Sequence, residues 1–222
     1  MSTFPMHEIV QYLAGLVIPG RTVLVGIDGG AGAGKTTFTE KFANRVREYV
    51  KPVSVVLTDL IYRPKADRWK GPPGEMPIGY DLDWERIRDQ VILPLRAGKT
   101  ARFQLYDWVE DRLNKMVEID VGGVTIVDGV FALRNELSDH YDLRIWFSCR
   151  LETRVARLLA RGDTPQNEID YWLPIEERYH AAHTPERSAH IIINSDVNVP
   201  ADDGFGQLKV VRWIKPETAE LP

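Results

Sequence analysis

The sequence predicts an α/β protein in which helices cover both faces of a mostly parallel sheet, a three-layer αβα sandwich. Two observations predict this fold. Short apolar runs, typical of strands buried on both faces, alternate along the chain with segments whose apolar residues recur at helical spacing. The first such strand, at residues 22–27, leads directly into a glycine-rich loop and a helix. This order is typical of the units that build parallel sheets.

The glycine-rich loop runs from Gly29 to Thr36 and fits the pattern G-x-x-x-x-G-K-[ST]. Glycines let backbone N–H groups turn inward around phosphate oxygens, where larger residues would clash. Lys35 then reaches the β- and γ-phosphates, while the hydroxyl of Thr36 binds Mg²⁺. The loop therefore predicts a phosphate-binding loop, or P-loop, formed by Gly29, Gly30, Ala31, Gly32, Ala33, Gly34, Lys35, Thr36 and Thr37.

Two acidic residues follow predicted strands. Asp59 comes after the apolar run at residues 53–58, and Asp128 follows the run at residues 124–127. Because parallel sheets bind ligands outside the carboxyl ends of their strands, we expect both carboxylates beside the phosphates. An acid at the position of Asp128 is typical of a Walker B site, so Thr36 and Asp128 are the predicted magnesium residues, although Asp-Gly also forms turns.

Composition indicates one domain. The chain has 222 residues, of which 44% are hydrophobic, and we expect a single unit with an N-terminal helix in 1–20, a core in 21–195 and a tail in 196–222. The net charge of −4 and the absence of a basic tract argue against a nucleic-acid partner. Short apolar runs and the lack of a secretion signal favour a cytoplasmic protein without a membrane partner, and a monomer or a homo-oligomer would fit.

The remaining elements follow from periodicity. A loop at residues 60–80, rich in proline and glycine, shows no sustained pattern and is predicted to be a lid or binding loop. The apolar runs at residues 101–106 and 115–121 are predicted to form a hairpin, which would display Tyr106, Asp107 and Trp108 at its tip. We expect helices at residues 6–16, 36–49, 84–95, 150–161 and 168–182. Pro174 is expected to limit where the last of these helices starts. The hairpin strands are predicted at 101–106 and 115–121, and further strands at 143–149, 191–193 and 208–214.

The helix at residues 150–161 carries four arginines that lie three and four residues apart and therefore share one face: Arg150, Arg154, Arg157 and Arg161. A lid over a triphosphate and a solvated helix face explain this pattern equally well. Similarly, Tyr62, Tyr106 and Trp108 are candidates for substrate contact, with half-buried aromatic residues as the alternative.

Taken together, these motifs resemble the uridine kinase-like family of P-loop kinases, which includes uridine kinases, phosphoribulokinases, pantothenate kinases and nicotinamide riboside kinases. The resemblance covers residues of about 20 to 195 and is strongest to bacterial uridine kinase-like proteins. Its motifs are the P-loop, residues 58–62, Tyr80-Asp81, Tyr106-Asp107, residues 127–129, the arginines at 157–161, Glu177-Arg178-Tyr179, Pro185 and residues 189–192.

The resemblance implies a P-loop kinase fold with a substrate-side hairpin and a helical lid, and phosphoryl transfer from ATP, with Mg²⁺, to a hydroxyl of a small molecule. Asp59 corresponds to the family's acid that accepts the hydroxyl proton, and Asp81 to its ribose ligand. Tyr106 corresponds to an aromatic contact on the hairpin. The lid arginines, with Arg157 and Arg161 as the catalytic candidates beside Lys35, would neutralise developing charge.

The sequence also departs from the family pattern. Uridine kinases place a histidine shortly after the Tyr-Asp of the hairpin, whereas this chain has Glu110 and Asp111 there, so recognition of a pyrimidine is in doubt. Leu82-Asp83 follows Asp81 where the family commonly has His-Pro, which makes Asp83 a rival for the sugar contact. The lid also lacks the further arginines of uridine kinases after Arg161.

The leading function is an ATP-dependent kinase for uridine or a related nucleoside. A kinase of the same fold for pantothenate, nicotinamide riboside or a sugar phosphate is one alternative. A sugar phosphate would require cations near the acceptor, which Arg63, Lys65, Arg68 and Lys70 could supply. A nucleotide-hydrolysing switch is the other alternative, but the Asn-Lys-x-Asp motif that reads guanine is absent.

Overall fold

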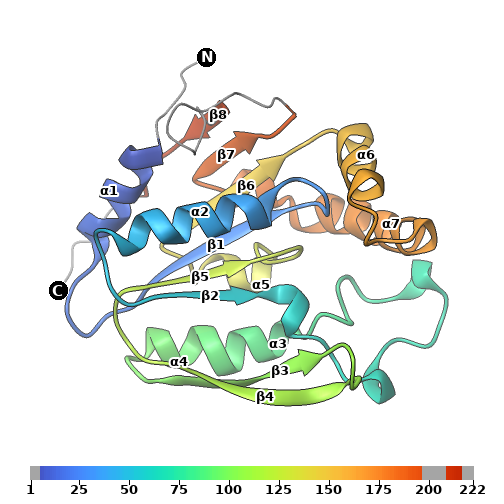
Figure 1. Ribbon diagram of the computed structural model, residues 1–222, viewed down its shortest axis with the longest axis horizontal. Coiled ribbons are helices and arrows are strands. Elements are labelled where there is room, and N and C mark those ends of the chain that lie inside the picture. Colours follow the sequence, from blue (N-terminus) through green and yellow to red (C-terminus); the bar gives the residue numbers. More distant parts are fainter. Residues whose placement is uncertain (1–5, 197–208, 217–222) are drawn as a thin grey trace.

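The computed structural model describes residues 6–196 and 209–216, built around a six-stranded sheet (Figure 1). The strand order is β2-β5-β1-β6-β7-β8, in which the first five strands run parallel and β8 is antiparallel to β7. The predicted mostly parallel sheet is confirmed. Its strands are β1 (Val23–Gly29), β2 (Val53–Leu57), β5 (Val124–Asp128), β6 (Leu143–Ser148), β7 (Ile191–Asn194) and β8 (Lys209–Trp213).

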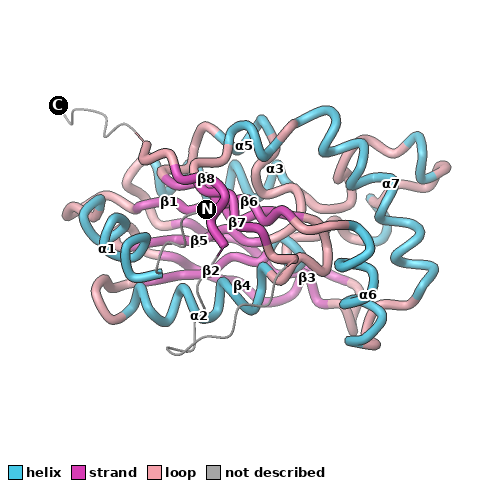
Figure 2. Tube along the Cα trace, turned by 90° about the horizontal axis from the view of Figure 1, so that it is seen from above, coloured by secondary structure: helices cyan, strands magenta, loops and turns pink. Residues whose placement is uncertain are grey.

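Helices cover both faces of this sheet, as predicted. In Figure 2, α2 runs along one side of the strands, and α5 and α7 lie on the other side. The helices are α1 (Met6–Leu16), α2 (Lys35–Arg47), α3 (Trp84–Arg86), α4 (Leu93–Arg96), α5 (Asn135–Ser138), α6 (Leu151–Arg161), α7 (Gln166–His183) and α8 (Pro185–Ser188).

Each face of the sheet has its own apolar core because side chains alternate along a strand. In β1, Val23, Val25 and Ile27 belong to the core that also contains the buried faces of α1 and α2. Leu24, between them, belongs to the opposite core, to which α7 contributes Tyr179. One apolar run therefore serves two layers and holds the end of β1 firmly in place.

The predicted helix at residues 84–95 is present, but it is not a regular α-helix. α3 continues without a break through a π-helical segment, Ile87–Ile92, into α4. Pro94 lies at the start of α4 and has no N–H to donate to the carbonyl of Gln90. A wider turn before a proline accommodates the missing bond, which periodicity alone does not reveal.

The prediction that Pro174 limits the start of the last long helix was wrong. α7 begins at Gln166 and contains Pro174 in its interior. Proline removes one backbone hydrogen bond there, while the buried side chains of Ile175 and Tyr179 pack into the core on one face of the sheet and hold the helix in place. Tertiary packing therefore outweighs the local cost of the proline.

The predicted hairpin is present as β3 (Ala101–Asp107) and β4 (Arg112–Ile119), which pair antiparallel. β4 begins earlier than the predicted residue 115, because the carboxylate of Asp107 closes a short turn. Its Oδ1 accepts hydrogen bonds from the N–H groups of Val109, at 2.9 Å, and Glu110, at 3.0 Å. The tip of the hairpin is therefore a tight, side-chain-capped turn.

The other predicted elements agree with the structure in type. The loop at residues 60–80 holds short 3₁₀ turns at Lys65–Asp67 and Pro73–Glu75, and its Tyr62 forms an isolated antiparallel bridge with Leu82. The predicted edge strand at residues 208–214 is β8, although Leu208 lies outside the described residues. Within residues 6–196 and 209–216, no helix has the length and apolar character needed to cross a membrane.

Gly129, directly after β5, permits a close approach between the ends of β5 and β2. Its φ is 153°, and a Cβ there would lie 1.8 Å from Oγ1 of Thr58. We predict that Gly129→Ala lowers the free energy of unfolding by roughly 2–3 kcal/mol in a urea titration. Gly74→Ala is the matched control, because a Cβ at Gly74 meets no atom within 4 Å. Equal stability of the two variants would contradict this account.

Candidate active site

The glycine-rich loop joins β1 to α2 at the carboxyl edge of the sheet. Gly34, the N-cap residue directly before α2, has a φ of 91°, and Gly32 has a φ of 78°. A Cβ at Gly32 would lie 2.6 Å from the carbonyl oxygen of Arg154, so a larger residue would push the loop away from α6. The loop therefore ends at the start of α2, where the helix dipole favours an anion.

Lys35 lies across this loop. It is 8% exposed, and its Nζ donates to the carbonyl oxygens of Gly29, at 2.7 Å, and Gly30, at 3.2 Å. A cavity of about 170 Å³ opens beside it and is lined by residues 32 and 34–37 together with Arg157, Leu158 and Arg161 of α6. Five of the nine predicted phosphate residues and the two predicted catalytic arginines thus line one cavity, whereas Gly29, Gly30, Ala31 and Ala33 do not line it.

The arginines of α6 do not act as one face. Arg157 donates from Nη2 to the carbonyl oxygen of Ser195 at 2.6 Å, and Arg161 pairs with Asp163 at 2.6 Å. Arg154 instead is buried, with its Nη1 2.6 Å from Oε2 of Glu176. Neither the solvated-face nor the lid hypothesis anticipated this burial, because the partner of Arg154 is on another helix.

Asp128 ends β5 and is 2% exposed. Burial raises the pKa of its carboxyl to about 6, although the Lys35 ammonium group opposes this shift. Its Oδ1 has no hydrogen-bond partner among the described residues. A second cavity, of about 270 Å³, is lined by both Thr36 and Asp128. A buried carboxylate oxygen without a partner, next to a hydroxyl, fits a magnesium ion that keeps few protein ligands.

A third cavity, of about 580 Å³, also borders the loop. Asp59, exposed just after β2, lines it together with the loop residue Ala31. The charge of Asp59 also raises the pKa of Asp128, so the two carboxylates are close enough to interact. The remaining walls are mainly apolar and aromatic, from Tyr62, Leu82, Trp108, Val130, Phe131, Leu158, Ile169, Trp172 and Leu173, with Arg161, Asp163, Thr164, Glu168 and Glu176 at polar positions.

Of the predicted substrate residues, Tyr62 and Trp108 line this cavity, with ring centroids 4.7 Å apart. The expectation that Tyr106 is displayed at the hairpin tip was wrong. It is 3% exposed and packs behind the other two rings, whereas Trp108 is 53% exposed. A β-bulge between Gln104 and Tyr106 changes the register of the hairpin there, and alternation in the sequence does not reveal it.

Asp81 and Asp83 are both buried, but they make different contacts. Asp81 accepts a hydrogen bond from the N–H of Trp69 at 2.9 Å and is close enough to raise the pKa of Tyr62. Asp83 caps α3, accepting from the N–H of Arg86, and lies 3.7 Å from Arg63. Neither residue is among those that line the cavity, although Asp81 interacts with Tyr62, which does line it.

Arg68 connects the hairpin to the long loop. Its guanidinium lies over the rings of Tyr62, Tyr106 and Trp108, at 4.8, 4.8 and 5.3 Å, and its Nη2 is 3.2 Å from Asp111. These contacts combine cation–π and ionic attraction in a partly buried place. The sequence showed Arg68 only as one cation in an irregular loop, so its position could not be predicted.

Trp108 also contacts the segment that carries Asp59. Its Nε1 donates to the carbonyl oxygen of Asp59 at 3.1 Å. The hairpin therefore supports the backbone at the predicted catalytic acid, in addition to contributing a wall of the cavity.

The chain is similar to known kinases. It is 29% identical over 172 residues to a uridine kinase of Macrococcus caseolyticus, an alignment covering 72% of this chain and 81% of that protein. A uridine kinase of Staphylococcus epidermidis is 28% identical over 190 residues, 81% of this chain and 88% of that protein. No protein-family model matches the chain.

Solved structures share its fold. A possible uridine kinase from Bacillus stearothermophilus superposes with a TM-score of 0.63 at 19% identity, covering 84% of this chain and 98% of the other. D-glycerate 3-kinase from Cryptococcus neoformans gives a TM-score of 0.58 at 11% identity, covering 85% and 95%. These likenesses confirm the P-loop kinase fold and the resemblance to uridine kinase-like proteins, and they support a phosphotransferase.

Asp128 provides a test of the magnesium site that does not need an acceptor. The pKa of its carboxyl rises from 3.8 to about 6 on folding, so the ionised form destabilises the native state above pH 6. We predict that Asp128→Asn raises the free energy of unfolding at pH 7.5 without magnesium by up to about 3 kcal/mol. This gain should vanish as the pH falls from 6 to 4, because the native carboxyl then becomes protonated.

The measurement is urea unfolding of both proteins at a series of pH values. Asp67→Asn, at an exposed position, is the control and should change stability little at any pH. In the presence of nucleotide, Asp128→Asn should also weaken magnesium binding. A variant less stable than the native protein at pH 7.5 would show that the native carboxylate has a stabilising partner and would refute the proposed site.

Proposed function

We propose that this protein is an ATP-dependent kinase that transfers the γ-phosphate to a hydroxyl group of uridine or a related nucleoside. The observation that carries the proposal is the aromatic-walled cavity of about 580 Å³, which is lined by both Asp59 and Ala31, the residue at the crest of the P-loop. A substrate hydroxyl in this cavity would lie between a carboxylate and the phosphate-binding loop. That is the arrangement needed for in-line phosphoryl transfer.

Each proposed role follows from position. Asp59 would accept the proton of the attacking hydroxyl, a contribution typically of ~10²–10⁴ in rate. Lys35, Arg157 and Arg161 surround the phosphate cavity and would neutralise charge on the transferred group. The backbone N–H groups of the loop would hold the β-phosphate. Thr36 and Asp128 would hold the Mg²⁺, which when bound shields the phosphate charges.

The aromatic rings favour a flat acceptor. Tyr62, Trp108 and Trp172 line the cavity, and stacking on such rings accommodates a nucleobase. Asp81, beside Tyr62, would accept hydrogen bonds from ribose hydroxyls. Asp111 does not replace the absent histidine as a base contact, because Arg68 and Lys65 both pair with it.

The alternative of a sugar-phosphate acceptor is disfavoured by the ion pairs of Arg63 and Arg68, the two arginines among the four loop cations. Arg63 forms an ion pair with Glu85 and lies 3.7 Å from Asp83, and Arg68 pairs with Asp111. An acceptor phosphate would have to compete with these carboxylates for both guanidinium groups. A neutral acceptor requires no such exchange.

The proposal predicts ADP release from Mg-ATP that depends on uridine or cytidine. Asp59→Asn should lower kcat by on the order of 10²–10⁴, and Lys35→Ala should abolish turnover. Asp120→Asn, an exposed acid beyond the end of β4, should leave the rate unchanged.

The assay should include pantothenate, nicotinamide riboside and sugar phosphates as acceptors. Stimulation by one of these instead of a pyrimidine nucleoside would keep the reaction and replace the substrate. Hydrolysis of ATP that no acceptor stimulates and that Asp59→Asn does not alter would refute the kinase and favour a nucleotide switch.

A further inference from the structure

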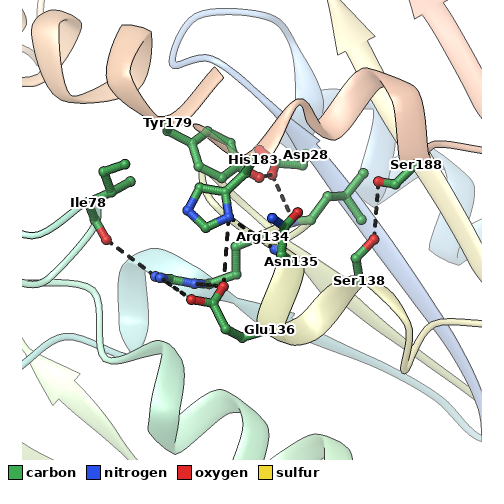
Figure 3. Close-up of polar contacts among 10 residues, drawn as sticks. Asp28, Ile78, Arg134, Asn135, Glu136, Ser138, Tyr179, His183 and Ser188 are labelled. Atoms are coloured by element: carbon green, nitrogen blue, oxygen red, sulfur yellow. Dashed lines mark hydrogen bonds and ion pairs between the residues drawn. The ribbon is translucent and has the colours of Figure 1, made fainter. Parts of the chain in front are cut away.

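A buried carboxylate lies directly beneath the P-loop. Asp28, the residue before Gly29 in β1, has no exposed surface. Its Oδ1 accepts from the N–H of Gly29 at 2.6 Å. Its Oδ2 accepts from the N–H of Leu133 at 2.8 Å and from the hydroxyl of Tyr179 at 2.6 Å, the last from α7 (Figure 3). Three donors from three segments of the chain therefore converge on this one side chain.

These contacts hold a charge that burial disfavours. Burial raises the pKa of Asp28 to about 6, and the bond from Tyr179 is the largest influence that opposes the rise. The pKa of the Tyr179 hydroxyl is itself raised well above its usual value by burial, so this group remains a hydrogen-bond donor. Short bonds to an ionised acceptor are stronger than bonds between neutral groups. The contact between Asp28 and Tyr179 is therefore a firm link between β1 and α7.

The same helix also holds the crest of the loop. Glu176, one turn before Tyr179, is 2% exposed and accepts from the N–H of Ala31 through Oε1 at 3.0 Å. Its Oε2 pairs with Arg154, whose Nη1 also donates to the carbonyl oxygen of Ala31 at 3.1 Å. Both backbone polar groups of Ala31, its N–H and its carbonyl oxygen, are thus held by side chains. Residues three apart on a helix share a face, so α7 reaches the base and the crest of the loop together.

The far end of α7 is fixed to the segment that supplies the Leu133 N–H. The N–H of Asn135 donates to Nδ1 of His183 at 3.1 Å, and Arg134 pairs with Glu136 at 2.9 Å (Figure 3). The guanidinium of Arg134 also lies 4.2 Å from the ring centroid of Trp84. The bond from Asn135 to His183 links α7, which carries Tyr179, to the segment that carries Leu133, and both segments donate to the Asp28 carboxylate.

We infer that α7 sets the conformation of the P-loop through the bond from Tyr179 to Asp28 and the bond from Ala31 to Glu176. Asp28, Tyr179 and Glu176 are then positioning residues for nucleotide binding, which act through the loop backbone and need not touch the acceptor. This inference rests on the proposed function insofar as the loop binds a nucleotide. It concerns the loop alone, so it holds for any acceptor.

The test is Tyr179→Phe, which removes one hydroxyl and keeps the ring that packs edge-on against Phe131 at 4.8 Å. The affinity for Mg-ATP is measured by calorimetry, well below the unfolding temperature of each protein. We expect the Kd to rise on the order of tenfold, because one of the three bonds to a charged group is lost. The KM for the acceptor should change by less than about twofold, since Tyr179 is not among the residues that line the acceptor cavity.

Tyr141→Phe is the matched control. The hydroxyl of Tyr141 is buried near Asp28, but it has no hydrogen-bond partner among the described residues. Its removal should leave the Kd for Mg-ATP unchanged. Asp28→Asn should weaken binding more than Tyr179→Phe does, because the amide group cannot accept all three bonds. In the double variant the two losses should be less than additive, because both remove the same bond.

The outcomes separate this inference from the proposed function. Failure of the native protein to bind Mg-ATP, with Lys35→Ala indistinguishable from it, would refute both. Native binding that Tyr179→Phe leaves unchanged, even if the variant unfolds at a lower temperature, would refute the positioning role and leave the kinase proposal intact. Additive losses in Asp28→Asn and Tyr179→Phe, or an equal loss in Tyr141→Phe, would also refute it.

Discussion

The structure of the site depends on how a loop made almost entirely of glycine and alanine is held in one conformation. Such a loop has few side chains with which to fix itself, and glycine has more backbone freedom to lose than any other residue. Here the fixing groups come from elsewhere in the chain. Asp28 holds the base through the N–H of Gly29, and Glu176 with Arg154 holds both polar groups of Ala31 at the crest.

These contacts place ionised groups in the interior, where desolvation costs free energy. The pair of Arg154 and Glu176 is buried, and so is Asp28, so each needs its partners. The same condition explains the glycine at position 30, where a Cβ would lie 1.9 Å from Nη1 of Arg154. The loop residue must therefore be small where a buried charged side chain packs directly against it.

The sheet brings the remaining chemistry to the same edge. β1 lies between β5 and β6, and β2 lies beyond β5, so the carboxyl ends of β1, β5 and β2 are neighbours. Those ends carry the P-loop, Asp128 and the segment of Asp59. Open parallel sheets bind ligands where neighbouring strands lead to opposite sides of the sheet. The hairpin contributes the aromatic ring of Trp108 to the wall of the large cavity, and α6 contributes Arg157 and Arg161 to the wall of the phosphate cavity.

Much of this could be predicted from the sequence, because the relevant signals are local. The glycine pattern, the apolar runs and the acids after them indicated the fold, the loop, Asp59 and Asp128. The contacts that hold the loop could not be predicted. Ala31 and Glu176 are 145 residues apart, and no periodicity relates them. The burial of Tyr106 and the cap formed by Asp83 likewise depend on tertiary contacts, which a linear pattern does not contain.

We propose that the loop between β1 and α2 binds the nucleotide phosphates. Hydrogen–deuterium exchange of the amides of residues 32–37, with and without Mg-ATP, is the direct test. We expect Mg-ATP to slow exchange in this segment of the native protein and to have no effect on Lys35→Ala. Unchanged exchange in the native protein at saturating nucleotide, or protection elsewhere on the molecule alone, would contradict it.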